Sequence, residues 1–555
     1  MNFPAPVLGV ALACASPAFA QCLTADLPNP SAAVADFYGR AVDLDGDRAL
    51  IGAPQIFSSQ PGKAAVHRRA PTGWTLEAEL VPPGGGSLDL FGLAVALDGD
   101  VAVVGAPSFG VSGAAYVFHF GAPPTGTEPA WSLAQTLLPP PGSANAHFGY
   151  SVAIDGGAIA VGAYGDDTED LDAGAVFVYR DALGTWFLDH AITTSAAGAG
   201  DRMGQTVALS GDFLLAGAPG NDDQGTEAGA VFAFRYNFGT DTWLLEDKLT
   251  APDAAAGDNF GDAVAFDSQP IVPSFPRAVV GAPEKFVGGV RTGAAYVFGR
   301  TTTPLPFIHD WAALATLLPA DVDADQRFGQ AVDLARDRAA VGAFRNDTAA
   351  EQAGAVSLFT HDPASDTWSH ELLLHSTTPG TFNHFGRGVA LADDALVIGE
   401  SGADPAGNNS GHARFYDVSS PCPALLGSVE ALSASAGGLQ DLHLFAGPEH
   451  AGKIYWLLGS VSGTAPGTGL LGAALPLNTD PYFNFTLTQP SVPPLVHSIG
   501  TLDAPGGVDL AGFLAPPNTP QNFVGTTFHH AYLVLGTTSG TVDFVSEAVP
   551  VTIVP

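Results

Sequence analysis

Three aspartates at alternate positions form the clearest candidate ion site in this sequence. Asp321, Asp323 and Asp325 have the spacing of the first three ligands of a calcium-binding loop. The sixth position of such a loop needs glycine, but Gln326 stands there, and Val332 replaces the terminal bidentate acid. The segment therefore predicts either a weak calcium site or a solvated acidic loop.

A second acidic cluster runs from Asp166 to Asp172. Asp166 and Asp170 are its candidate metal ligands, because carboxylate oxygens are the donors that calcium prefers. The same two interpretations, a weak calcium site and a solvated loop, apply here. No other cofactor is expected.

Motifs for catalysis are weak or missing in the sequence. His370 and His375 flank an acidic residue as in zinc proteases, but the spacing is one residue too long. The segment is also a predicted strand, which would place the two imidazoles on opposite faces. The sequence contains no G-x-S-x-G elbow, phosphate-binding loop or C-x-x-C pair. We therefore predict a protein without catalytic residues, not an enzyme.

The first residues and the cysteines indicate export. Residues 1–20 contain an apolar stretch and end in the small-x-small sequence Ala18-Phe19-Ala20, as in a cleaved secretory signal peptide. Cleavage after Ala20 would remove Cys14 and leave Cys22 and Cys422. In an oxidising compartment this pair predicts a disulfide, provided that the fold brings the two residues together. We expect a secreted or cell-surface protein.

The net charge excludes two classes of partner. The chain has 56 acidic and 20 basic residues, which gives a formal charge of -36. A field of this sign repels nucleic acid and anionic membrane surfaces. No segment after the signal is apolar over a length that would span a bilayer. Cations or basic partners are the ligands compatible with this charge. We expect an extracellular protein or glycan as partner, and a monomer.

Internal repetition decides the expected architecture. An aromatic-Gly step occurs six times and a Met-Gly variant once, at Tyr38-Gly39, Phe91-Gly92, Phe148-Gly149, Met203-Gly204, Phe260-Gly261, Phe328-Gly329 and Phe385-Gly386. A second glycine follows each step at a fixed spacing, except in the fifth unit, where an inserted loop lengthens the interval. An aliphatic residue precedes each step at a fixed distance, from Leu27 in the first unit to Leu374 in the seventh.

Each unit predicts four short antiparallel strands with a tight Asp-Gly turn, and seven such units are typical of a β-propeller. The seventh unit lacks its fourth strand, whereas residues 22 to 27 match the fourth-strand register of the other units. We therefore predict that residues 22 to 27 pair with residues 411 to 417 and close the ring. This pairing would bring Cys22 near Cys422 and so favours the disulfide.

These motifs resemble the FG-GAP repeat family, whose best-known members are the propeller heads of integrin α subunits. The resemblance covers Gln21 to about Val418 and rests on Phe91-Gly92 with Gly105-Ala106-Pro107 and on the six further copies. It implies a seven-bladed β-propeller in which an N-terminal strand completes the last blade. The calcium loops of integrins are not carried over, because the turns between the first and second strands are too short here to surround an ion.

After Cys422 the repetition stops, and short strand-like runs separated by Gly and Pro predict a β-sandwich-like domain. The expected organisation is a signal peptide over 1–20, the propeller over 21–420 and the second domain over 424–555. Among the predicted strands of that domain is the run from Tyr482 to Leu487.

The expected function is a secreted, non-catalytic binding or adhesion module. It would present the acidic loops of one propeller face to a protein, a glycan or a cation. Two alternatives stay open, a structural component of an extracellular matrix or surface layer and a hydrolase that uses the loops of the propeller face.

Overall fold

The structure is a computed structural model that describes residues 22–554 apart from short gaps. The gaps are residues 57–59, 71–72, 87, 122–128, 142, 144, 269–275, 303–308, 321–322, 377, 405–408, 419–424, 428–430, 434, 436–437, 446–452, 463, 465–467, 471–472, 490–493, 497, 502–506, 516–519, 521–522, 536–541 and 547–548. Two compact units are present, one over Leu23–Ser420 and one within Pro421–Pro555.

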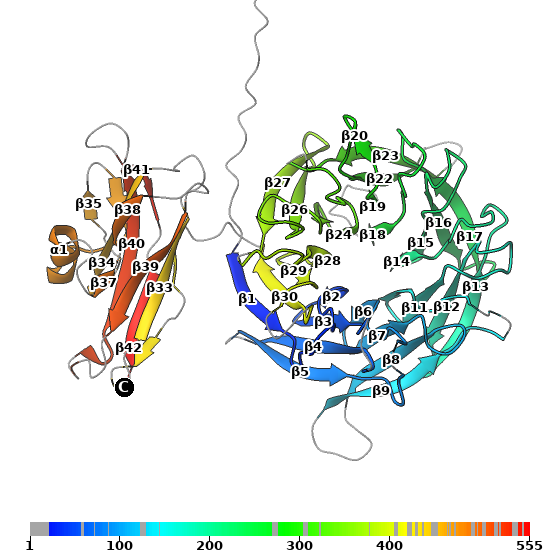
Figure 1. Cartoon of the computed structure of the whole chain (residues 1–555), viewed down its shortest axis with the longest axis horizontal. Helices are drawn as coiled ribbons and strands as arrows, with labels where there is room; N and C mark the ends of the chain where they lie inside the picture. The colour runs from blue at the N-terminus through cyan, green and yellow to red at the C-terminus, as the bar shows by residue number, and fades with distance from the viewer. Residues whose placement is uncertain are drawn as a thin grey trace, which may run out of the picture. The chain divides into compact units, whose positions relative to one another are not determined.

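The first unit contains seven four-stranded sheets among its described residues, arranged in a ring (Figure 1). The first three sheets, or blades, consist of β2 (Val42–Asp45), β3 (Arg48–Ala53), β4 (Lys63–Ala70) and β5 (Gly73–Leu80); β6 (Val95–Asp98), β7 (Val101–Ala106), β8 (Ala114–Gly121) and β9 (Ala130–Leu137); and β10 (Ser151–Asp155), β11 (Ala158–Ala163), β12 (Ala175–Asp181) and β13 (Trp186–Ile192). Blades four and five consist of β14 (Thr206–Ser210), β15 (Phe213–Ala218), β16 (Ala230–Asn237) and β17 (Thr242–Leu249); and β18 (Ala263–Asp267), β19 (Arg277–Ala282), β22 (Ala294–Thr302) and β23 (His309–Leu317).

Blade six consists of β24 (Ala331–Ala335), β25 (Arg338–Ala343), β26 (Ala355–Asp362) and β27 (Thr367–His375). The last blade joins β28 (Phe385–Leu391), β29 (Ala395–Glu400) and β30 (His412–Asp417) to β1 (Cys22–Pro28) from the other end of the chain. A small hairpin, β20 (Phe286–Val287) with β21 (Val290–Arg291), extends from the fifth blade. The first strand of each blade faces the centre of the ring in Figure 1 and the fourth strand lies outside. The predicted β-propeller is confirmed.

Glycines set the spacing between neighbouring blades. An ideal Cβ at Gly281 would lie 1.8 Å from the carbonyl oxygen of Gly329 in the next blade, and one at Gly105 would lie 2.0 Å from the Gly149 oxygen. The same contact occurs at every blade interface. No side chain fits between two backbones this close, so the inner strands converge only where glycine stands.

Closure of the ring repeats this interface between the last blade and the first. A Cβ at Gly399 would lie 1.8 Å from the Gly39 oxygen, and Tyr38 forms a bridge with Gly411 just as Phe148 does with Gly113. In the added strand β1, Asp26 accepts a hydrogen bond from His412 at 3.0 Å. The prediction that the N-terminal strand pairs with β30 is confirmed.

The hydrophobic core is divided among these interfaces. Each of seven clusters of buried side chains joins two neighbouring blades. The repeated aromatic residues, such as Phe91, Phe148 and Phe260, are fully buried in them. The repeated aromatic residues therefore serve blade packing.

Carboxylates at the turns between first and second strands connect one blade to the next. The central turn residues are the glycine and the residue after it, as in Gly99-Asp100, so the preceding aspartate ends its strand. Asp45 accepts a hydrogen bond from the Gly99 N–H at 2.7 Å, and Asp98 accepts one from the Gly156 N–H at 2.8 Å. These aspartates therefore fasten neighbouring blades.

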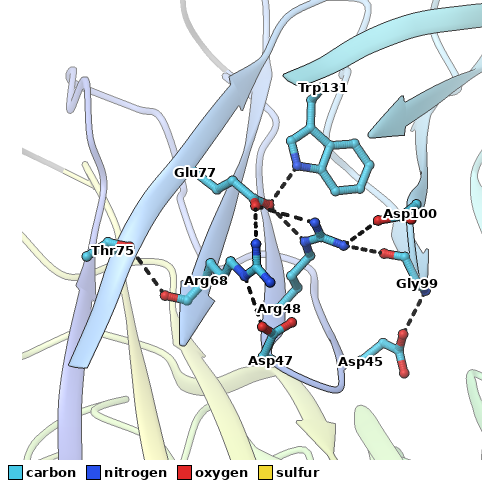
Figure 2. Close-up of polar contacts among 9 residues, drawn as sticks. All are labelled: Asp45, Asp47, Arg48, Arg68, Thr75, Glu77, Gly99, Asp100 and Trp131. Atoms are coloured by element: carbon cyan, nitrogen blue, oxygen red, sulfur yellow. Dashed lines mark hydrogen bonds and ion pairs between the residues drawn. The ribbon is translucent and has the colours of Figure 1, made fainter. Parts of the chain in front are cut away.

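Figure 2 shows a denser connection between the first two blades. Arg48 donates to Glu77 at 2.9 Å and to Asp100 at 2.8 Å, and Trp131 donates to Glu77 at 2.8 Å. The Arg48 side chain is 9% exposed and that of Glu77 is 13% exposed. Removing one partner of such a buried pair would leave an unpaired charge.

The second unit has two larger sheets among its described residues. One contains β31 (Leu425–Gly427), β33 (Gly438–Phe445), β39 (Gly507–Ala515) and β37 (Leu495–Val496); the other contains β32 (Ala431–Ser433), β42 (Val549–Val554), β40 (Thr527–Leu535), β34 (Ile454–Ser460), β38 (Ile499–Thr501) and β41 (Val542–Val545). β35 (Thr468–Leu470) pairs with β36 (Ala473–Leu475). Phe513 of the first sheet packs on Phe528 of the second, with ring centroids 4.8 Å apart, so the two sheets face each other as in a sandwich.

The predicted strand from Tyr482 to Leu487 is wrong, because this segment lies in helix α1 (Pro481–Thr488). Asp480 caps the helix by accepting from the Phe483 N–H at 2.8 Å, and Pro481 occupies the first helical position. These two residues are a helix-start signal that outweighs the aromatic, strand-like composition of the segment. Burial alone would raise the pKa of Asp480, but hydrogen bonds from Phe483, Ser460 and Ser462 lower it to about 2.

Two of the sequence predictions lie outside the described residues. The signal peptide comprises residues 1–20, and the Cys22–Cys422 disulfide needs the Cys22 side chain and residue 422. Within the described part of the chain, no helix is both long and apolar enough to cross a membrane.

Replacing Gly281 with alanine should destabilise the propeller by about 3 kcal/mol, at the upper end of the usual overpacking cost, since the new methyl group would force two backbones apart. The expected result is a lower denaturant midpoint in equilibrium unfolding. The control is Gly198→Ala, where the nearest atom to a Cβ is a side-chain oxygen 3.8 Å away, so little change is expected. Equal stability of both variants would contradict the proposed contact.

Replacing Leu27 with alanine should destabilise the chain by about 2–5 kcal/mol, as is usual for a buried leucine. Leu27 in β1 is 0% exposed, and its counterpart Leu80 in the first blade is 3% exposed. We expect Leu27→Ala and Leu80→Ala to shift the denaturant midpoint similarly. A negligible effect of Leu27→Ala beside a large effect of Leu80→Ala would show that β1 is not an integral strand.

Candidate functional site

Seven residues surround one end of the propeller axis, each directly after the glycine of a repeated aromatic-Gly or Met-Gly step. They are partly exposed and line a cavity of about 280 Å³. We call them and this cavity the axial mouth: Arg40, Leu93, Tyr150, Gln205, Asp262, Gln330 and Arg387. The loops around it are those between second and third strands and those that link the blades.

A tight turn repeated in every blade points these residues toward the axis. In the third blade, the Tyr150 N–H donates to the His147 carbonyl at 3.1 Å, and the Gly149 N–H donates to Gly162 at 3.0 Å. His147 adopts φ 54°, a left-handed conformation that is uncommon for a residue other than glycine. All seven blades have a non-glycine residue with positive φ at this position. The turn is constant, whereas the side chain that follows it differs from blade to blade.

One carboxylate of the axial mouth is held by two amides. Asp262 accepts a hydrogen bond from the Gln205 amide at 2.6 Å and another from the Gln330 amide. Burial raises the pKa of Asp262, while the two amides and the charge of Arg387 act in the opposite direction. Asp262 therefore lies in a fixed polar arrangement on one side of the axis.

Two arginines occupy neighbouring blades of the axial mouth. Burial lowers the pKa of Arg40, and burial together with the positive charge of Arg40 lowers that of Arg387. Phe344 lies under Arg387, with the guanidinium carbon 4.3 Å from the ring centroid. Burial, together with the charges of Arg387 and Arg345, lowers the pKa of the nearby His384 to about 4.

An aromatic group borders the third blade. The Tyr150 ring meets the Tyr164 ring edge-on with centroids 4.8 Å apart, and His147 stacks on Tyr164 at 4.7 Å. The axial mouth thus combines flat apolar surfaces with guanidinium, amide and carboxylate groups. Such a combination is typical of small-molecule binding sites.

A second cavity of about 260 Å³ continues along the axis and contains two carboxyl groups, Asp43 and Asp333. The other five blades have alanine at this position. Burial raises the pKa of Asp43 to about 6, and burial raises that of Asp333 to about 7, with a further contribution from the charge of Asp43. Backbone N–H groups of Leu97 and Leu391 donate to them, each at 2.6 Å.

The carboxylates predicted as metal ligands lie in the loops outside the axial mouth. Asp166 is buried and accepts from the Thr168 N–H at 2.9 Å, and Asp170 accepts from the Leu171 N–H at 2.8 Å. Both therefore shape their own loop.

The other predicted cluster is only partly described. Asp323 accepts from the Asp347 N–H at 2.6 Å, and Asp325 pairs with Arg291 at 2.5 Å, a hydrogen bond that lowers the pKa of Asp325. Asp321 lies outside the described residues. Among the residues that are described, no group of three or more His, Cys, Asp or Glu side chains could hold a metal ion. Calcium binding at either cluster stays a prediction.

The two histidines of the zinc-protease-like segment lie on strand β27, as predicted, but their predicted placement on opposite faces is wrong. A β-bulge at Glu371 shifts the register, so that His370 pairs with Phe359 and His375 with Ala355. Because Phe359 and Ala355 share one face of β26, both histidines are on the same face. Their positions are four steps apart in the strand register, roughly 13 Å along a strand.

Sequence reasoning missed the axial mouth. The available signal was the residue after each repeated glycine, where an otherwise apolar strand begins with Arg, Gln, Asp or Tyr in six of seven units. The significance of this position depends on the ring, which brings seven strand starts to one axis.

A sequence model described as FG-GAP repeat matches the chain at residues 74–118, 131–179, 186–234, 243–298, 311–359 and 368–414, which together make up more than half of it. Each match begins in the fourth strand of one blade and ends in the third strand of the next. This offset explains why the last blade needs a strand from the N-terminal end.

Solved structures show distant similarity. A protein from Lactobacillus plantarum is 14% identical over 62% of this chain and 86% of that one, with a TM-score of 0.41. Sqt1 from Chaetomium thermophilum, bound to the N-terminus of the ribosomal protein L10, is 13% identical over 68% of this chain and 86% of that one, with a TM-score of 0.39. No curated protein matches the chain.

The two buried carboxyl groups of the second cavity should make stability depend on pH. An unfolded aspartate has a pKa near 3.9, whereas the folded values are about 6 for Asp43 and about 7 for Asp333. Between these values the folded state keeps protons that the unfolded state releases, so stability falls as pH rises from about 4 to 7. The double variant Asp43→Asn, Asp333→Asn should therefore gain more Tm at pH 8 than at pH 5, by a few °C.

The control for this measurement is Asp362→Asn. A hydrogen bond from the Ala364 N–H lowers the pKa of Asp362, so this carboxylate makes stability change with pH in the opposite direction. No gain at pH 8 is expected for it. Equal Tm gains of the double variant at both pH values would contradict the assigned cause.

Proposed function

This chain belongs to the FG-GAP repeat family, and on that premise we propose that it is an exported, non-catalytic binding module that takes its ligand at the axial mouth. The ligand is an extracellular protein or glycan. The acidic loops around the axial mouth form the rim of the recognition surface.

The observation that carries this proposal is the contrast between a constant scaffold and a variable site. The turn before each mouth residue is repeated in all blades. In each turn the residue two positions before the glycine of the repeated step has a left-handed backbone conformation, and the same backbone hydrogen bond measures 3.0–3.2 Å. The side chains presented by that turn nevertheless vary, with polar or charged groups in six of the seven blades, and they surround a cavity. Packing needs only the scaffold, so the variable side chains are available for recognition.

The composition of the axial mouth favours binding over catalysis. Its seven residues include no Ser, Cys, His or Lys, and its single carboxylate, Asp262, already accepts hydrogen bonds from two amides. A nucleophile with an adjacent base, which a hydrolase of the usual type needs, is not among these seven residues.

Export is supported by the signal-like sequence of residues 1–20 and by the strongly acidic composition. The pair Cys22 and Cys422 suits an oxidising compartment. The pairing of β1 with β30 brings the beginning and the end of the propeller together, which is the arrangement that a disulfide between these cysteines requires.

One observation favours a second function, that of a self-assembling structural component. The fourth strands of five blades each expose a leucine by 36–47%: Leu76, Leu133, Leu188, Leu245 and Leu314. Fourth strands are the open edges of their sheets, and apolar edges promote association. Concentration-dependent assembly of the full chain without a ligand would favour this alternative.

Binding at the axial mouth should be lost when Tyr150 is replaced with alanine. The test is an array of glycans and extracellular peptides probed with the full chain, followed by titration of the best ligand with and without calcium. We expect Tyr150→Ala to weaken binding by about tenfold or more, as removal of a central aromatic contact does. The matched control is Leu183→Ser on the turn between β12 and β13, at the opposite end of the blade, where the side chain is fully exposed. A ligand that binds both variants as well as wild type would contradict the assigned site.

A further inference from the structure

Positive charge gathers at the axial mouth of an otherwise acidic protein. Three of the 20 basic residues, Arg40, Arg345 and Arg387, lie close enough for their charges to act on one another or on His384. Repulsion between Arg40 and Arg387 disfavours the ligand-free state. An arrangement of this kind is stabilised when an anion lies between the two guanidinium groups.

These arginines differ from the buried Arg48, Arg300 and Arg414 in having no carboxylate partner. Arg48 pairs with Glu77 at 2.9 Å, Arg300 with Glu246 at 2.6 Å and Arg414 with Glu400 at 3.0 Å. Within the described residues, no acidic side chain lies within ion-pair distance of Arg40, Arg345 or Arg387. The donors of Arg40 and Arg387 are therefore available to a ligand.

The nearby carboxylate does not neutralise both guanidinium groups. Asp262 supplies a single negative charge, and its oxygens accept from Gln205 and Gln330. It lies in the fifth blade, whereas Arg387 and Arg40 belong to the adjacent seventh and first blades. The axial mouth thus has a cationic side and a side with amide and carboxylate groups.

The remaining groups suit a sugar ring. Hydroxyl groups can donate to Asp262 and pair with the two glutamine amides, and the apolar face of a pyranose can pack on an aromatic ring such as Tyr150. The cavity of about 280 Å³ lies at the low end for small-molecule sites, which fits one monosaccharide residue. A peptide side chain would use the arginines but would leave the hydroxyl-binding side unoccupied.

We propose that the axial mouth binds the terminal uronic acid residue of an acidic glycan, with its carboxylate between Arg40 and Arg387 and its hydroxyl groups on Gln205, Asp262 and Gln330. This inference rests on the proposed function and names the ligand class of the same site. A planar carboxylate can accept paired hydrogen bonds from each guanidinium group, which a neutral sugar cannot do.

The test is calorimetric titration of the full chain with tetragalacturonate in calcium-free buffer of low ionic strength. The matched ligand is the fully methyl-esterified tetramer, which keeps the rings and removes the charge. We expect the ester to bind about tenfold more weakly or worse, because hydrogen bonds to charged groups contribute about 1.5–3 kcal/mol. Arg40→Gln and Arg387→Gln should each weaken binding of the acid to a similar degree.

The control variant is Arg180→Gln, whose arginine is 40% exposed and pairs with Asp189 at the other end of a blade. It should bind like wild type. Thermal melts check that each variant is folded.

Several results would overturn the inference. Equal binding of the acid and the ester would show a neutral-sugar site, and tighter binding of a glutamate-rich peptide that competes at the mouth would show a peptide site. Both results would leave the proposed function intact, provided that Tyr150→Ala still weakens binding about tenfold or more. Failure of tetragalacturonate to bind would also refute the inference. Binding that neither the arginine variants nor Tyr150→Ala affects would refute both proposals.

Discussion

The contact between glycine backbones of neighbouring blades is the constraint on which the rest of this structure depends. At each interface the second-strand glycine of one blade meets the repeated glycine of the next at a distance that admits no Cβ, and Gly399 against Gly39 repeats the contact where the ring closes. Each hydrophobic cluster is shared by two neighbouring blades, and one of them joins the last blade to the first, so the clusters also form a closed ring. Blade spacing, closure and a hollow axis all follow from this one contact.

The binding site is a consequence of that geometry. Because the glycine lies against its neighbour and the residue before it is buried, the next side chain is directed toward the axis. Blade packing does not depend on this side chain, so Arg387 and Gln205 can stand at equivalent positions. At the turns, by contrast, Asp45 and Asp98 connect blades, which gives part of the acidic composition a structural purpose.

The repeated features of the fold were predictable, since periodic residues report packing directly. Leu27 showed that the first strand belongs to the last blade, and Phe148 showed which side chains fill the interfaces. Features that occur once were harder, such as the helix after Asp480, whose segment has the aromatic content that is typical of a strand. The placement of His370 and His375 failed for another reason. A bulge recurs between the third and fourth strands of six blades, but residue spacing in the sequence does not reveal it. Arg40 and Arg387 were overlooked because they are 347 positions apart in the printed sequence and meet only in a closed ring.

A crystal structure of the full chain with tetragalacturonate tests the central claim most directly. The account predicts one terminal sugar residue on the axis, with its carboxylate within hydrogen-bond distance of both Arg40 and Arg387 and its hydroxyl groups facing Asp262. A sugar bound only on the outer loops, or an axial mouth whose arginines are paired with the protein's own carboxylates, would contradict it.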